Sequence, residues 1–231
     1  MNNTVDQDDL KKIAGKLNKS YYPKKEESLE INFSLEYNPQ DGKQASSIRP
    51  KHTGFRLSSS DQTEIAIVAP QALIIAQLAP YPGWNKFYER MESAWKIWKR
   101  IVKAQDISRI GVRYINRIDI PTDESKNLNV MDYLSFYPNS PVFSELPMTD
   151  YHIQVTTPTP NPLWSANIAS FIQQPPVLVD TISLILDIDT YNTEELPLDD
   201  KGIMSRLAEA REMKNHIFKQ CITTKTEKLF Y

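Results

Sequence analysis

Arginine recurs at every fourth residue in the segment RIGVRYINRIDIP, residues 109–121. In a β-strand alternate side chains share a face, so Arg109, Arg113 and Arg117 are expected to project together, opposite the apolar residues. Asp119 shares this polar face. A guanidinium group binds phosphate or carboxylate through two parallel hydrogen bonds. The segment therefore predicts a binding site for an anion or for a charged partner.

A second polar stripe occurs in DTISLILDIDTY, residues 180–191. Alternation places Asp187 and Asp189 opposite the aliphatic side chains of this expected strand. Two carboxylates two residues apart are a candidate metal site. Alternatively, Arg113 or Arg117 meets one of these aspartates across one sheet, a contact that contributes about 0.2–1 kcal/mol. We favour ion pairing over anion binding, and anion binding over a metal site.

One cation interrupts an apolar stripe near the end of the sequence. The periodicity of residues 200–221 predicts a helix, and Lys214 falls in the middle of its apolar side. A lysine there extends its alkyl chain along apolar surface and carries its ammonium to the rim. The alternative is a buried acidic partner or an anionic ligand, which makes Lys214 a fourth candidate anion-binding residue.

The motifs of several enzyme classes are missing from the sequence. Six glycines form neither a Walker loop nor a dinucleotide-binding fingerprint, and three histidines show no metal-ligand spacing. Cys221 is the single cysteine; it lies on the apolar side of the expected last helix and is interpreted as a packed thiol. We therefore expect no catalytic residues and no cofactor.

Composition and charge are those of a globular protein without a strongly basic surface. The formal net charge is -2, with 40% hydrophobic and 24% charged residues. The longest apolar run, residues 65–80, is interrupted by Pro70 and Gln71 and is shorter than the ~20 residues that a membrane helix needs. With one cysteine and no targeting segment in the polar start, we expect a cytoplasmic protein without a membrane span.

The hydrophobic periodicity predicts helices and strands in two halves of similar plan. In the first half we expect a helix over 6–18, a half-buried strand over 28–37, three short strands within 52–78 and a long helix over 84–103. In the second half we expect a strand over 108–120, a short helix over 127–136, strands over 149–157, 164–173 and 180–191, and a helix over 200–221.

This order predicts an α+β fold with two structurally similar halves, residues 1–106 and 107–231. Each half would be an antiparallel sheet packed by one long helix, as in helix-grip or TATA-binding-protein-like folds. The first half would then lack one strand that the second half has in 108–120.

The hairpin of residues 65–78 is apolar on both faces, although a sheet with one wet side alternates apolar and polar residues. Six aliphatic residues are predicted to form an interface between halves, between subunits or with an apolar ligand: Ile65, Ile67, Val68, Leu73, Ile74 and Ile75. Burying four aliphatic side chains contributes about 6–12 kcal/mol. We expect Ile67 and Ile74 to lie on opposite faces.

Four pieces of the sequence together resemble a known family. They are Gly83-Trp84 with Phe87, the segment 109–121, the LDID of residues 186–189, and MKNHIFKQCITTKTEKLF, residues 213–230. The chain resembles a sporadically distributed family of uncharacterised prokaryotic proteins, whose members usually open with an apolar strand ahead of the first helix; this chain begins at the helix. The resemblance implies a prokaryotic origin, and the scattered occurrence is typical of accessory genes such as defence or toxin–antitoxin systems.

Two functions follow from these patterns. The first is a non-enzymatic binding or interaction protein of a prokaryotic accessory system, with a protein partner or a homo-oligomer. The alternative is a nucleotide- or nucleic-acid-binding protein, including a nuclease, that uses the arginine stripe and the Asp-x-Asp pair.

Overall fold

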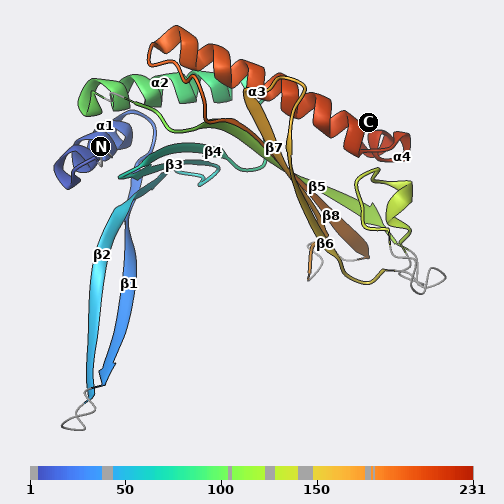
Figure 1. The fold of residues 1–231 in the computed structure, drawn as a ribbon, viewed down its shortest axis with the longest axis horizontal. Coiled ribbons are helices and arrows are strands. Elements are labelled where there is room, and N and C mark those ends of the chain that lie inside the picture. Colours follow the sequence, from blue (N-terminus) through green and yellow to red (C-terminus); the bar gives the residue numbers. More distant parts are fainter. Residues whose placement is uncertain are drawn as a thin grey trace. The chain divides into compact units, whose positions relative to one another are not determined.

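A computed structural model describes residues 5–37, 44–103, 106–122, 128–139, 148–174, 178 and 180–230. The chain divides into two compact units, Met1–Gln105 and Asp106–Tyr231. In the described residues each unit contains a four-stranded antiparallel sheet that contacts helices, so the protein has the α+β class predicted from the sequence (Figure 1).

The first unit is an antiparallel meander that one helix precedes and a second helix follows along the chain. Its sheet has the order β1-β2-β3-β4. The elements are α1 (Gln7–Ser20), β1 (Lys24–Tyr37), β2 (Gln44–Ser58), β3 (Glu64–Ala69), β4 (Ala72–Gln77) and α2 (Trp84–Val102). Both predicted helices and the strand predicted over 28–37 are present. Of the three short strands predicted within 52–78, two are present as β3 and β4, and the first is the end of the longer strand β2.

Helix α1 provides most of the helical side of the first core. It begins after Asp6, whose carboxylate accepts a hydrogen bond from the Asp9 amide at 2.8 Å, as an N-cap does. Its apolar side, including Leu10 and Leu17, is buried against the sheet. The longer helix α2 contacts both α1 and β4, so two helices share the inner side of this sheet where one was expected.

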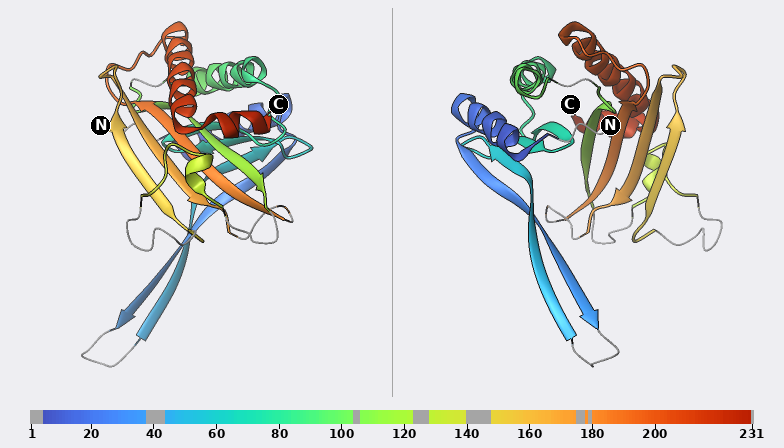
Figure 2. Two further views of the ribbon diagram at one scale, coloured as in Figure 1. Left: turned by 90° about the vertical axis from the view of Figure 1, so that its right-hand side faces the viewer. Right: turned by 60° about the vertical axis from the view of Figure 1, so that its left-hand side comes forward.

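Most of the β1–β2 ladder is two strands wide. The two strands pair from Lys24 with Ser58 to Tyr37 with Gln44, but β3 pairs only with the residues Phe55–Ser58 of β2. The ladder therefore extends past the rest of the sheet as a ribbon (Figure 2). The half-buried alternation predicted for residues 28–37 concerns side chains that lie largely outside the described residues.

The second unit builds its sheet in a different order, β5-β8-β7-β6. Its elements are β5 (Ile110–Pro121), the 3-10 helix η1 (Val130–Asp132), β6 (His152–Pro158), β7 (Trp164–Ile172), β8 (Thr181–Asn192), α3 (Asp200–Cys221), α4 (Thr224–Glu227) and η2 (Lys228–Phe230). All four predicted strands are present. The predicted short helix over 127–136 is reduced to the single turn η1.

Helix α3 covers one face of this sheet, so the two faces differ: one belongs to the core and the other is not covered by the helix. Leu184, Leu186 and Ile188 of β8 are fully buried in the core cluster that Cys221 of α3 joins. Thr190 ties strand to helix, because its hydroxyl donates to the Ala210 carbonyl at 2.9 Å. The alternation of β8 then directs its aspartates to the opposite face.

The two sheets differ at the strand that precedes the long helix. In the second unit β8 precedes α3 and lies between β7 and β5, whereas in the first unit β4 precedes α2 and ends the sheet.

Within the described part of the chain, no helix is long and apolar enough to cross a membrane.

Candidate interaction surfaces

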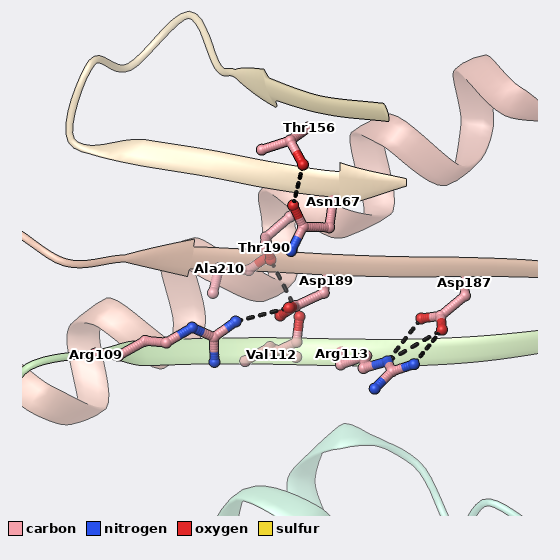
Figure 3. A network of polar contacts seen from close by, with 9 residues as sticks. All are labelled: Arg109, Val112, Arg113, Thr156, Asn167, Asp187, Asp189, Thr190 and Ala210. Carbon is pink, nitrogen blue, oxygen red and sulfur yellow. Dashed lines mark hydrogen bonds and ion pairs between the residues drawn. The ribbon is translucent and has the colours of Figure 1, made fainter. Parts of the chain in front are cut away.

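The two polar stripes meet on the face of the second sheet opposite α3. Strands β5 and β8 are antiparallel, with Arg113 directly opposite Asp189 and Ile115 directly opposite Asp187. Arg113 bonds its diagonal neighbour Asp187, and Arg109, which precedes β5, bonds Asp189 at 2.6 Å between Nη2 and Oδ2 (Figure 3). A diagonal neighbour is within reach because the arginine side chain is long.

Arg113 has the most extensive of these contacts. Its Nε donates to both oxygens of Asp187, at 2.9 and 3.1 Å, and its Nη2 also donates to Oδ2. This hydrogen bonding raises the pKa of Arg113 above its usual value. The ion pair that the sequence predicted between the two stripes is therefore present as Arg113 with Asp187.

Arg117 pairs within its own strand instead of across the sheet. Its Nε donates to Asp119 Oδ2 at 3.0 Å, and the other oxygen of Asp119 accepts from the Ser183 hydroxyl at 2.6 Å. The sequence-based alternatives that paired Arg117 with Asp187 or Asp189 are wrong: Asp187 lies diagonal to both Arg113 and Arg117, but it bonds Arg113, and Arg117 bonds Asp119.

The ion-paired face continues across the whole sheet. Arg109 lies over the ring of Tyr191, 4.5 Å from its centroid, and Thr156 of β6 donates to Asn167 of β7 at 2.8 Å (Figure 3). His152 of the edge strand β6 and Phe171 of β7 lie directly opposite each other and stack with ring centroids 5.2 Å apart. Sequence reasoning missed these residues, although the alternation of 164–173 already placed Asn167 and Phe171 on one face.

This face is charge-balanced and accessible. The arginine side chains are 47%, 60% and 45% exposed at 109, 113 and 117, whereas their aspartate partners are only 12–24% exposed. Ile115 lies between the arginines of β5 and is 63% exposed. We define this surface, formed by Arg109, Arg113, Ile115, Arg117, Asp119, Asp187 and Asp189, as the paired-charge face.

The geometry does not support the candidate metal site at Asp187 and Asp189. Both carboxylates accept hydrogen bonds from guanidinium groups, whose positive charge would repel a cation placed between them. Over the residues that the structure describes, no group of three or more His, Cys, Asp and Glu side chains is arranged to hold a metal ion.

Lys214 does not lie on the paired-charge face, although the sequence pattern placed it with the arginines as a candidate anion-binding residue. It is 7% exposed on α3, and its Nζ lies 3.7 Å from the ring centroid of Tyr114. Tyr114 alternates with Arg113 and therefore faces the opposite side of β5. Burial and, to a smaller extent, the nearby charge of Arg211 lower the pKa of Lys214 to about 8. In the described part of the chain no carboxylate pairs with it.

The hairpin of the first unit forms a second candidate surface. Ile67 lies directly opposite Ile74, so the two side chains share a face, and the expectation that they lie on opposite faces is wrong. The turn at residues 70–71 causes this, because it pairs Ala69 with Ala72 and so fixes the register of the two strands.

Only two of the six predicted interface residues, Ile67 and Ile74, remain accessible for an interface. Val68 is fully buried in the core of the first unit, and Leu73 and Ile75 pack against that core. The other face carries Ile65, Ile67 and Ile74; Ile65 is buried, Ile67 is half-buried and Ile74 is 47% exposed.

Comparison with protein-family models, with curated proteins and with solved structures found no match. The function must therefore be inferred from the two surfaces themselves.

Proposed function

We propose that this chain is a non-enzymatic binding protein and that the paired-charge face of its second unit binds a protein partner. The observation that carries this proposal is the pairing of every arginine of the stripe with an aspartate. The face therefore has no excess of positive charge, yet the three guanidinium groups remain about half exposed.

A polyanion fits this face poorly. Proteins bind nucleic acid largely by neutralising phosphates with free cationic side chains. A phosphate at Arg113 would approach Asp187 as well, and displacing that aspartate would leave a mostly covered carboxylate, 12% exposed, without its partner.

A protein surface with charges of both signs fits better. Each guanidinium has five N–H donors, so an arginine that already bonds an aspartate retains donors for a second acceptor. Arginine and tyrosine are enriched where binding energy concentrates in interfaces, and Arg109 stacked on Tyr191 supplies both. Ile115, 63% exposed, supplies an apolar contact between the arginines.

The finer fold assignment is also part of the proposal. We infer that both units share the helix-grip or TATA-binding-protein-like plan and that the first unit lacks the strand equivalent to β5. The support is the common order of antiparallel strands followed by a long helix, with β4 and β8 in the same position before it. The family resemblance suggests that the protein partner belongs to the same prokaryotic accessory system.

A photo-crosslinking residue at Ile115 tests the function in native-host cells. We expect one discrete crosslinked protein, identified by mass spectrometry. In a first control, the photo-crosslinking residue replaces Lys201, which is exposed on α3, and should not capture that protein. In a second control, Arg113→Gln should weaken the capture of that protein from position 115. The same products from both positions would contradict the proposal.

The nucleic-acid alternative has its own outcome. Fluorescence anisotropy with labelled single- and double-stranded oligonucleotides at low ionic strength should show no binding. Binding that is lost in Arg113→Ala with Arg117→Ala, at an unchanged melting temperature, would establish the alternative and overturn the protein-partner proposal.

A further inference from the structure

Strand β4 has one free edge in the described structure. The sheet of the first unit ends at β4, which pairs only with β3. The Leu78 amide donates to the Thr63 carbonyl at 2.7 Å, and these two residues continue the β3–β4 register. Because hydrogen bonding alternates along an antiparallel pair, Ala72, Ile74 and Ala76 bond to β3. Leu73, Ile75 and Gln77 consequently direct their N–H and C=O groups to the free edge.

The second unit contains an equivalent strand that is paired on both edges. There the strand before the long helix, β8, has β7 on one side and β5 on the other, and β5 runs antiparallel to it. An antiparallel strand is therefore the expected occupant beside β4. It has to be apolar on both faces, because β4 presents Leu73 and Ile75 on the core face and Ile74 and Ala76 on the other.

Strand β4 itself is apolar on both faces, and its residue types have nearly the same order in both chain directions. The segment Gln71–Gln77, QALIIAQ, is a palindrome in residue type centred on Ile74: glutamine at both ends, then alanine, then leucine or isoleucine. When such a strand pairs antiparallel with its own copy, each residue lies opposite a residue of the same or a similar type.

We propose that β4 pairs with β4 of a second copy of this chain about a twofold axis at Ile74. Ile74 of one copy then lies opposite Ile74 of the other, Leu73 opposite Ile75, Ala72 opposite Ala76 and Gln71 opposite Gln77. Leu73 and Ile75 exchange N–H···O bonds across the axis, because both direct their backbone groups to the edge. The two sheets join into one of eight strands.

The twofold arrangement also explains why an exposed apolar edge strand is tolerated. An unpaired edge with aliphatic side chains is a template for uncontrolled association. An isologous pair uses the β4 edge of both copies and closes the contact. The paired-charge face belongs to the second unit and takes no part in this contact, so the dimer and the protein partner are independent proposals.

Sedimentation velocity of the full chain tests the dimer. We expect wild type to dimerise and Ile74→Lys, which places two like charges opposite each other, to weaken association at least about 100-fold. Since Ile74 is 47% exposed, its replacement should leave the fold intact by circular dichroism. Ile115→Lys, the same change at an exposed isoleucine of the other sheet, should dimerise as wild type does.

A disulfide tests the register. Opposed residues that do not bond each other have Cα atoms about 4.5 Å apart, within disulfide range. Ile74→Cys should therefore form a covalent dimer under mild oxidation, whereas Ala76→Cys, which lies opposite Ala72, should not. A wild-type protein that stays monomeric, or an Ile74→Cys protein that does not crosslink, would overturn the proposal.

Discussion

Lys214 is expected to destabilise the second unit at neutral pH. It is a buried cation on α3 whose Nζ contacts the Tyr114 ring, and burial lowers its pKa from 10.5 to about 8. A fall of this size corresponds to about 3 kcal/mol of penalty on the charged form in the folded state. The cation–π contact offsets about 1–2 kcal/mol of it. Lys214→Met, which keeps an unbranched side chain of similar length, should therefore raise the free energy of unfolding at pH 7 by roughly 1–3 kcal/mol.

The pH dependence identifies the cause of this effect. Below pH 8 the lysine is protonated in both the folded and the unfolded protein, so the full penalty applies. Between pH 8 and 10.5 the folded protein releases the proton while the unfolded chain keeps it. The free energy of unfolding of wild type therefore rises with pH relative to that of Lys214→Met. The advantage of Lys214→Met should accordingly shrink through this window.

Denaturant unfolding of both proteins at pH 7 and pH 9, followed by circular dichroism, measures this difference. Burial raises the pKa of Cys221 to about 11 and that of Tyr22 to about 12; both groups are common to the two proteins and cancel in the comparison. Lys201→Met, at an exposed position of the same helix, is the matched control and should change little at either pH. A Lys214→Met protein that is less stable than wild type at both pH values would refute the reasoning, because the ammonium would then be net stabilising.

Three further expectations concern the ion pairs and the first core. A double-mutant cycle of Arg113 with Asp187 should show a coupling of about 0.5–1 kcal/mol, while the cycle of Arg117 with Asp187 should show none within error. Gly54→Ala should lower the free energy of unfolding by about 2 kcal/mol or more. Gly54 has φ +141°, and an added Cβ there would lie 2.2 Å from the Val68 carbonyl oxygen; a melting temperature close to wild type would contradict this steric argument. Val68→Lys should unfold the first unit, since the site is fully buried, and a folded variant by circular dichroism would show that the core tolerates a charge.

The helices and the alternation of faces within a single strand could be predicted because they depend on local geometry. The period of 3.6 residues put Leu10 and Leu17 on one side of α1, where both are buried. The period of two separated the aspartates of β8 from its buried Leu184 and Leu186. These relations concern residues a few positions apart and need no knowledge of the neighbouring strand.

The pairing of charges depended on strand neighbours and register. Alternation alone allowed Arg113 and Arg117 equally to meet an aspartate of β8. Only the register of β5 against β8 puts Asp187 diagonal to both arginines; it bonds Arg113, and Arg117 bonds Asp119 of its own strand. Register between strands that are about 70 residues apart is set by the packing of the whole sheet, which no local pattern contains.

The sequence by itself determined which residues of β4 are apolar and that they repeat in both directions around Ile74. The tertiary structure decided which of them are in the core and that β4 ends its sheet in the described chain. The physical reason is that a side chain's face follows from backbone alternation, whereas an unpaired edge follows from the order in which distant strands assemble.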